Sequence, residues 1–178
     1  MISRKATTPS SKNWLDRLSP RLLKLGINLW PPFLGSGIKV ISISPDFRHV
    51  KAVLKSRLFN KNYVGTHFGG SIFSLSDPFF MLILIKNLGR NYIVWDKAAQ
   101  IEFKKPARGT LTAIFTFQDD EIELIRQMAN QNGKHIFDKS VDILNEQGEI
   151  VASVSKTLYV KCKDTARIAE SILIEQDK

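Results

Sequence analysis

The strongest pattern in the sequence is an apolar stretch from Gly69 to Leu88, which is hydrophobic on nearly every face of the helix that it predicts. Gly89 ends this helix, and Pro78 predicts a bend at Asp77, because proline disfavours helical geometry at the residue before it. A helix without a polar face has to be covered on most of its sides. The pattern therefore predicts a curved sheet wrapped around one helix, or a sheet on one side and a second subunit on the other.

Alternating apolar and polar positions predict about six strands around this helix. The strands are expected at residues 38–43, 50–59, 92–104, 110–117, 135–144 and 149–161. The turn that contains Pro106 and Gly109 predicts a hairpin of the third and fourth strands. The turn at residues 145–148 predicts a second hairpin, of the last two strands. The expected fold class is α+β.

Smaller helices are predicted outside this framework. Ser19 as the N-cap and Pro20 at the first helical position predict a helix that ends at Trp30. Asp120 and Glu123 predict a capping box for a short amphipathic helix. The chain is thereby divided into an N-terminal tail with a helix, the main domain, and a C-terminal tail that can be helical, at residues 1–36, 37–162 and 163–178.

The composition is that of one soluble domain, with 178 residues, 43% hydrophobic and 24% charged. The single Cys162 excludes an intramolecular disulfide and a cysteine-rich metal site. The basic N-terminus lacks the apolar run of a signal peptide, and the stretch from Ser71 to Ile85 is too short to span a membrane. We therefore expect a cytoplasmic protein with no membrane partner.

The net charge of +9 favours anionic partners. The Lys and Arg residues are scattered, however, and the aromatic and basic signatures of nucleic-acid modules are missing from the sequence. We expect no nucleic-acid partner. A phosphate-bearing small molecule, or solubility alone, accounts for the charge.

The segment from Asn62 to Asp77 combines N-x-x-G, a glycine pair at the start of the apolar helix, and one carboxylate on that helix. It resembles the hotdog-fold acyl-CoA thioesterases, particularly their phenylacetate-type branch, which carries N-x-x-G-x-x-H-G-G and an acidic residue on the helix. The residues that fall into register with that motif are Asn62, Gly65, Gly69, Gly70 and Asp77. The resemblance implies a hotdog fold, with an antiparallel sheet around one long helix, and thioester hydrolysis by a homodimer or a dimer of dimers.

Later parts of the sequence extend the resemblance over residues 38–161. They are similar to a group of bacterial thioesterase-like proteins that share a domain of unknown function, in Y-I-V-W-D-K at Tyr92–Lys97, I-E-F-x-K-P at Ile101–Pro106 and K-T-L-Y-V-K at Lys156–Lys161. One position departs from the phenylacetate-type motif. Phe68 stands where those enzymes have histidine, and His67 stands one place earlier.

The glycine pair and the carboxylate are the candidate catalytic groups. The first amide N–H groups of a helix have no partner within it, so Gly69 and Gly70 can hold the oxyanion that develops on a carbonyl, although glycines there also serve simple turns. Asp77 in an apolar helix calls for a cleft or a partner; it can activate water or act as the nucleophile, or simply bond to a neighbouring backbone or serine group. Asp77 lies eight residues after Gly69, roughly 12 Å along one helix, so it has to serve the glycines of a second, antiparallel subunit.

Four further residues complete the candidate site. Asn62 can orient the water or cap the loop, since Asn is a common turn residue. His67 and Phe68 are candidate substrate contacts beside the glycines, and Asp96 occupies a strand position that supplies a polar group to the site in some phenylacetate-type relatives. The spacing of the histidines fits no metal pair, so we expect no metal and no cofactor.

The leading hypothesis is the hydrolysis of acyl-CoA or acyl-carrier thioesters, with Lys104, Lys105 and Arg108 near the CoA phosphates or simply in a solvated turn. An alternative keeps the fold without catalysis: a carrier of acyl or aromatic ligands, with a pocket lined by Phe68, Phe79 and Phe80. A protein-interaction module has no specific sequence feature in its favour. Dehydratase chemistry, also known on this fold, is disfavoured because His67 is the only histidine near the start of the helix.

Overall fold

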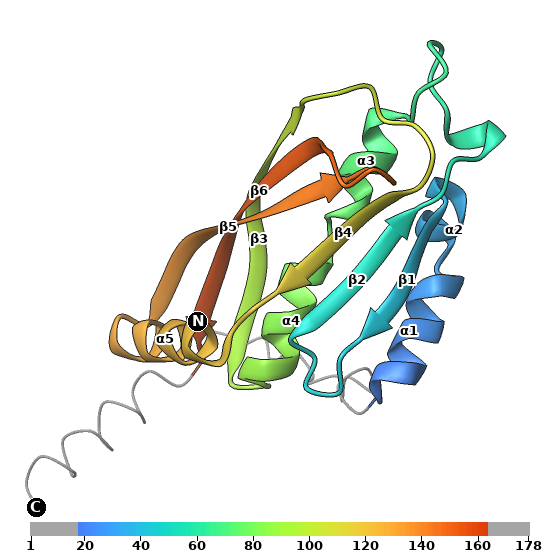
Figure 1. Cartoon of the computed structure of the whole chain (residues 1–178). Coiled ribbons are helices and arrows are strands. Elements are labelled where there is room, and N and C mark those ends of the chain that lie inside the picture. Colours follow the sequence, from blue (N-terminus) through green and yellow to red (C-terminus); the bar gives the residue numbers. More distant parts are fainter. Residues whose placement is uncertain (1–17, 164–178) are drawn as a thin grey trace, which may run out of the picture.

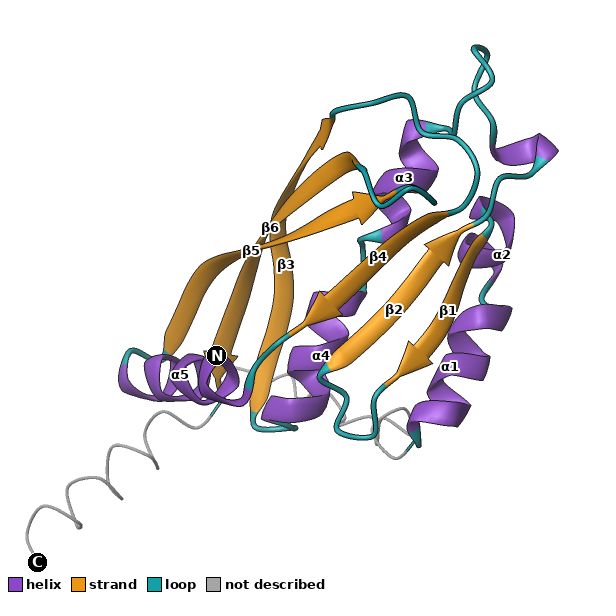
Figure 2. Cartoon of the chain, viewed as in Figure 1, coloured by secondary structure: helices purple, strands orange, loops and turns teal. Residues whose placement is uncertain are grey.

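A six-stranded antiparallel sheet curves around a central helical segment in the computed structural model, which describes residues 18–163 (Figures 1 and 2). The strands follow the order β1-β2-β4-β5-β6-β3 across the sheet. Their bounds are Ile38–Ile43 (β1), His49–Leu54 (β2), Tyr92–Phe103 (β3), Leu111–Thr116 (β4), Lys134–Leu144 (β5) and Ile150–Cys162 (β6). The predicted α+β class, with a sheet wrapped around one helix, is confirmed.

The central segment consists of two helices, α3 (Gly69–Leu75) and α4 (Phe79–Leu88). Between them the chain tightens, because the amide of Ser76 donates to the Phe73 carbonyl at 3.0 Å and that of Asp77 donates to the Ser74 carbonyl at 3.2 Å. Both are contacts to the third residue back rather than the fourth. The bend predicted at Asp77 is therefore present as a break in the helix.

Aromatic packing joins α4 to the sheet. Phe79 and Phe80 are buried, and their rings lie 4.8 Å and 5.2 Å from the ring of Phe115 on β4. Residues 69–88 are long and apolar enough to cross a membrane by length and composition alone. Here they are the core helix of the fold, because buried side chains of α3 and α4 pack against the sheet.

The hairpin predicted from the third and fourth strands is wrong. β3 lies at the edge of the sheet and pairs with β6, while β4 pairs with β2 and β5. Alternation shows that a segment is a strand but does not show which strand lies beside it, and the connection through Pro106 and Gly109 is long enough to cross the end of the sheet. The last two strands do form the predicted hairpin, β5 with β6.

Two boundaries also differ from the expectations. β2 ends at Leu54, and the following Leu58–Asn60 forms a 3₁₀ turn, η2, instead of more strand. Helix α5 (Asp119–Gln131), which packs on β5 and β6, begins one residue earlier than its predicted cap. Its capping box is formed by Gln118 and Glu121, because the side chain of Gln118 can accept an amide hydrogen bond as Asp can. The helix expected in residues 164–178 lies outside the described part.

Helices α1 (Pro20–Leu29) and α2 (Pro31–Ser36) cover the β1 edge of the sheet, opposite the β3 edge (Figure 1). Ser19 caps α1 as predicted, accepting from the Leu22 amide at 3.4 Å. The side-chain amide of Asn28 then makes two hydrogen bonds to the backbone of Val40 on β1, one to its carbonyl at 3.0 Å and one from its N–H at 2.7 Å. These bonds take up backbone groups of β1 that would otherwise be free for another strand.

Candidate functional site

The loop that leads into α3 is organised around Asn62. Its Oδ1 accepts the amides of Val64 and Thr66 at 3.1 and 3.0 Å, and its Nδ2 donates to Thr66 Oγ1 at 2.7 Å. Gly65 completes the turn with a positive φ of 75°. The Asn62 side chain therefore holds the loop together, which is the second of the two roles that the sequence allows for it.

His67 is buried and attaches this loop to the connection between β3 and β4. Its amide donates to the Ala107 carbonyl at 2.9 Å, and its Nε2 lies 2.8 Å from the Gly109 carbonyl oxygen. Because a carbonyl only accepts, Nε2 carries the proton, and in the neutral ring Nδ1 keeps a lone pair. This Nδ1 is buried and has no partner among the described residues.

The amides of Gly69 and Gly70 open α3. Within residues 18–163, neither N–H has a hydrogen-bond acceptor, whereas the amides of Ser71 and Ile72 both donate to the Phe68 carbonyl. Phe68 stands at the N-cap, and its ring covers Gly70 so closely that an added Cβ would lie 2.3 Å from its Cε1. The start of α3 thus presents two free donors under an exposed aromatic ring.

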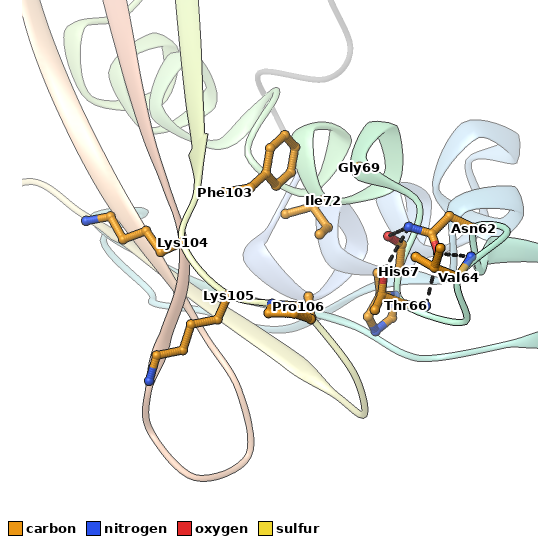
Figure 3. Close-up of a pocket in the computed structure, with 11 residues that line it drawn as sticks. Asn62, Val64, Thr66, His67, Gly69, Ile72, Phe103, Lys104, Lys105 and Pro106 are labelled. Carbon is orange, nitrogen blue, oxygen red and sulfur yellow. Dashed lines mark hydrogen bonds between the residues drawn. The ribbon is translucent and has the colours of Figure 1, made fainter.

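A pocket of about 440 Å³ lies between this loop, the start of α3 and the end of β3 (Figure 3). Three of the sequence-predicted site residues line it, Asn62, His67 and Gly69. In Figure 3 the ring of Phe103 and the side chain of Ile72 lie beside Gly69, while Lys104 and Lys105 point away from His67. The pocket is therefore lined by apolar side chains, by Gly69 with its free amide, and by His67, whose buried ring nitrogen has no partner in the described residues.

The basic residues at the rim are partly engaged. Lys105 pairs with Glu149 at 2.7 Å, and Arg108 donates to the Gly65 carbonyl at 3.3 Å. Lys104 lies 3.7 Å from Glu102 and is 39% exposed. Arg108 thus braces the loop, and Lys104 is the most loosely held of the three cations.

Asp77 and Asp96 come together elsewhere, around the buried ammonium of Lys156. Lys156 Nζ lies 2.5 Å from Asp96 Oδ2, 3.2 Å from Asp77 Oδ1 and 2.6 Å from the Asp77 backbone oxygen. The Asp77 side chain is nevertheless 63% exposed, and that of Asp96 is 21% exposed. Neither carboxylate lines the pocket, in keeping with the separation along the helix that the spacing predicts.

Lys156 is missing from the residues singled out in the sequence, although the sequence carries a signal for it. On β6 the side chains that face the core are Ala152, Val154, Lys156, Leu158 and Val160, and all of them are buried. One lysine stands in an otherwise apolar inward row. Such a position requires partners for the charge, and the structure supplies them.

The structure corrects the pocket expected for a carrier of acyl or aromatic ligands. Phe79 and Phe80 are 0% and 1% exposed and pack in the core, so they do not line the pocket beside Gly69, and only Phe68 of that set is accessible. Their role follows from the helix being apolar all round, which places neighbouring residues on covered faces. Among the described residues, no group of three or more His, Cys, Asp or Glu side chains is placed to hold a metal ion.

Sequence comparison assigns the chain to a family. The profile of a domain of unknown function, DUF4442, matches residues 20–160. The chain belongs to the DUF4442 family. Among curated proteins, none matches this DUF4442 chain significantly in sequence.

Solved structures similar to this DUF4442 protein include several described as thioesterases. PA5026 of Pseudomonas aeruginosa, a protein of unknown function and probable thioesterase, has 20% identity and a TM-score of 0.70 over 80% of this chain and 95% of its own. Thioesterase HI1161 of Haemophilus influenzae has 15% identity and a TM-score of 0.61, over 82% and 92%. PaaI of E. coli, from the phenylacetic acid degradation operon, has 19% identity and a TM-score of 0.53, over 76% and 87%. The predicted hotdog fold is thereby confirmed.

Proposed function

We propose that this DUF4442 protein hydrolyses acyl-CoA or acyl-carrier thioesters. The amides of Gly69 and Gly70 polarise the thioester carbonyl, and the partner subunit's Asp77 activates water or attacks as the nucleophile. The protein acts without a metal or cofactor, as a cytoplasmic homodimer or dimer of dimers. Nucleic acid and membranes have no part in this reaction.

The observation that carries the proposal is the pocket in which Gly69 and His67 meet. Gly69, whose amide has no acceptor among the described residues, and His67, whose buried Nδ1 has no partner there, both line one largely apolar hollow. Buried polar groups in folded proteins are nearly always paired, so an unpaired donor and an unpaired acceptor in one hollow are what a polar ligand needs. A thioester carbonyl takes the donor, and an N–H or hydroxyl of the same substrate takes the acceptor.

Assembly supplies the carboxylate. Asp77 does not line the pocket of its own chain, yet its side chain is 63% exposed at the break between α3 and α4. β3 forms an edge of the sheet and carries exposed Ile93 and Trp95. An antiparallel partner along this edge would place each subunit's Asp77 toward the other's Gly69. In this arrangement Asn62 and His67 hold the loop before α3, and Phe68 covers the entrance to the site. Asp96 binds the Lys156 ammonium that also contacts Asp77.

The positive charge of the chain fits the CoA moiety. Lys104 borders the pocket and is only loosely paired with Glu102. A phosphate can displace such a weak, exposed contact at little cost. Lys105 and Arg108 lie nearby on the same connection and add to the positive field.

Thioester hydrolysis by the purified protein tests the proposal, assayed over a series of acyl-CoA chain lengths with wild type and Asp77→Ala. We expect turnover of at least one chain length and a loss of kcat of about 100-fold or more in the variant, since it removes the base or nucleophile. Asp120→Ala, on the exposed start of α5, is the matched control and should keep wild-type kcat. No turnover at any chain length, or an unimpaired Asp77→Ala, would contradict the proposal.

Binding without turnover would favour the alternative, a carrier of acyl or aromatic ligands. Phe68, which stands in place of the motif histidine and is 57% exposed, is the observation in its favour. Calorimetric titration with a non-hydrolysable acyl-CoA thioether separates the two functions. A carrier binds it and spares the natural thioester, whereas a hydrolase binds it and turns the thioester over.

A further inference from the structure

Lys156 is the only Lys, Arg, Asp or Glu side chain that is buried within residues 18–163, with 1% of its surface exposed. It projects from β6 toward the core, among apolar neighbours of the same inward row. Burying an ammonium group is costly unless its three donors all find acceptors. The acceptors that Lys156 contacts therefore indicate the role of this buried charge.

All three donors of Lys156 reach oxygen atoms of two residues. Asp77 supplies its backbone oxygen at 2.6 Å and its Oδ1 at 3.2 Å, and Asp96 supplies Oδ2 at 2.5 Å. The ammonium thus holds Asp77 at two points, one on the main chain and one on the side chain. Two such contacts fix the direction of the carboxylate as well as its place.

Both acceptors come from irregular positions of the fold. Asp77 lies in the break between α3 and α4, where the helical hydrogen bonding is interrupted before Pro78. Asp96 lies at a register shift of β3, where the residue that follows it, Lys97, has no direct partner on β6. β-Bulges of this kind redirect side chains and are common beside active sites. A helix break and a bulge in different elements converge on one ammonium group.

The charges at this cluster are unequal, with two carboxylates and one ammonium. Asp96 is mostly buried, and one of its oxygens, Oδ1, has no partner in the described residues. Asp77 is mostly exposed. Lys156 therefore pairs closely with the more buried carboxylate and leaves the other facing outward.

We infer that Lys156 is a positioning residue for Asp77. Its ammonium holds the Asp77 backbone and carboxylate in place and lies against the carboxylate of Asp96, so that Asp77 faces out of the subunit. This inference rests on the proposed function, because it assigns Asp77 as the group that acts on the thioester.

If Lys156 had a purely structural role, removing its charge together with that of Asp96 would leave kcat no lower than removing the Asp96 charge alone. Buried ion pairs contribute little net stability, and replacing both partners by neutral side chains of similar shape is often tolerated. Lys156→Met alone leaves Asp96 without its counter-charge and can disturb the fold. The double variant Lys156→Met/Asp96→Asn removes both charges and still deprives Asp77 of its anchor, so it isolates the positioning role.

The kinetic test compares this double variant with Asp96→Asn alone. We expect kcat to fall about tenfold or more from the single to the double variant while KM changes less than about twofold, because the loss affects orientation in the reacting complex. Circular dichroism and the unfolding midpoint establish that both variants are folded. Equal kcat values in the two folded variants would overturn the inference.

A second measurement does not depend on activity. In protein labelled with ¹⁵N-lysine, the Lys156 Nζ resonance is assigned by its loss in Lys156→Met, and it should shift in Asp77→Asn. An Nζ chemical shift that is unchanged in Asp77→Asn would also overturn the inference. If wild type hydrolyses no thioester while the resonance responds, the proposed function fails and the coupling of Lys156 to Asp77 stands. If wild type is active but the double variant matches Asp96→Asn, the proposed function stands and the positioning role of Lys156 fails.

Discussion

Gly37 shows how one residue determines the course of the chain toward the candidate site. It ends α2 with φ of 80°, a left-handed conformation that side chains rarely adopt. A Cβ at this position would lie 2.5 Å from Asn60 Nδ2 and 2.9 Å from the Lys55 carbonyl oxygen. Asn60 is buried and donates to the carbonyls of Ser36 and Lys55, so it cannot move aside without losing both bonds.

Gly37→Ala should therefore destabilise the protein by about 1–3 kcal/mol, from strain at positive φ and the displaced Asn60 amide. Gly35→Ala is the matched control, because Gly35 lies in α2 without positive φ and has open space around its Cα. It should be neutral or slightly stabilising. Urea denaturation of both variants checks the prediction, and equal midpoints would contradict it.

At the residue scale, candidate site residues can be recognised from the sequence where a residue type conflicts with its surroundings. Asp77 was recognisable because a carboxylate in an apolar helix needs an explanation, and Lys156 could have been found by the same reasoning in the inward row of β6. The pairing of Lys156 with Asp77 and Asp96 could not be predicted, since it depends on a helix break and a β-bulge that meet across the fold. The free Nδ1 of His67 likewise depends on Gly109, forty-two residues later.

At the scale of elements, short polar turns hold the strands in register. The turn between β1 and β2 is closed by Asp46, whose carboxylate accepts from the hydroxyl of Ser44 and from the Arg48 amide at 3.0 Å. The hydrogen bond from the Ser44 hydroxyl, followed by that from the Arg48 backbone, lowers the pKa of Asp46 from 3.8 to about 2. Arg48 also pairs with Asp119 at the start of α5, so this turn connects the sheet to a helix.

Acid should weaken this turn. A carboxyl group whose pKa is lower in the folded protein stabilises the fold above pH 3.8, and its contribution is lost as the pH falls toward 2. Because Asp46 is 43% exposed, solvent screening limits the effect to about 1 kcal/mol or less. Unfolding free energies at pH 6 and pH 2.5 should differ less in Asp46→Asn than in wild type. An identical acid response of the two proteins would contradict the prediction.

Element types were easier to predict from the sequence than element partners. Proline and glycine gave the ends of α1, the break before α4 and the β5–β6 turn, because these residues restrict the backbone locally. The pairing of β3 with β6 could not be predicted, since the pattern within a strand does not show which strand lies beside it. A local pattern describes a segment, whereas strand order depends on contacts made across the whole chain.

At the scale of the whole molecule, the proposed site requires two subunits, and subunit mixing tests that directly. Asp77→Ala lacks the carboxylate, and Gly69→Val fills the pocket mouth beside Phe103, whose exposed ring can give way. A heterodimer of the two inactive chains contains one intact site, formed by the glycines of one chain and the carboxylate of the other. The isolated mixed dimer should then have about half of wild-type activity, since it has one intact site of two.

Co-expression of two differently tagged chains, followed by isolation of the mixed dimer, provides the measurement. Each variant alone should retain only residual activity. Mixed dimers that stay inactive although both chains are folded would show that the carboxylate does not act across the interface. An active strict monomer would exclude the two-subunit site altogether.

The two edges of the sheet are unlike. Asn28 of α1 occupies backbone groups of β1, while β3 is the opposite edge and has no neighbouring strand beyond it in the described chain. Growth by strand addition is thus open in one direction only. Two copies joined through β3 would use up both open edges and leave a helix guarding each end of the joint sheet, so the assembly would be self-limiting and could not propagate into a fibre.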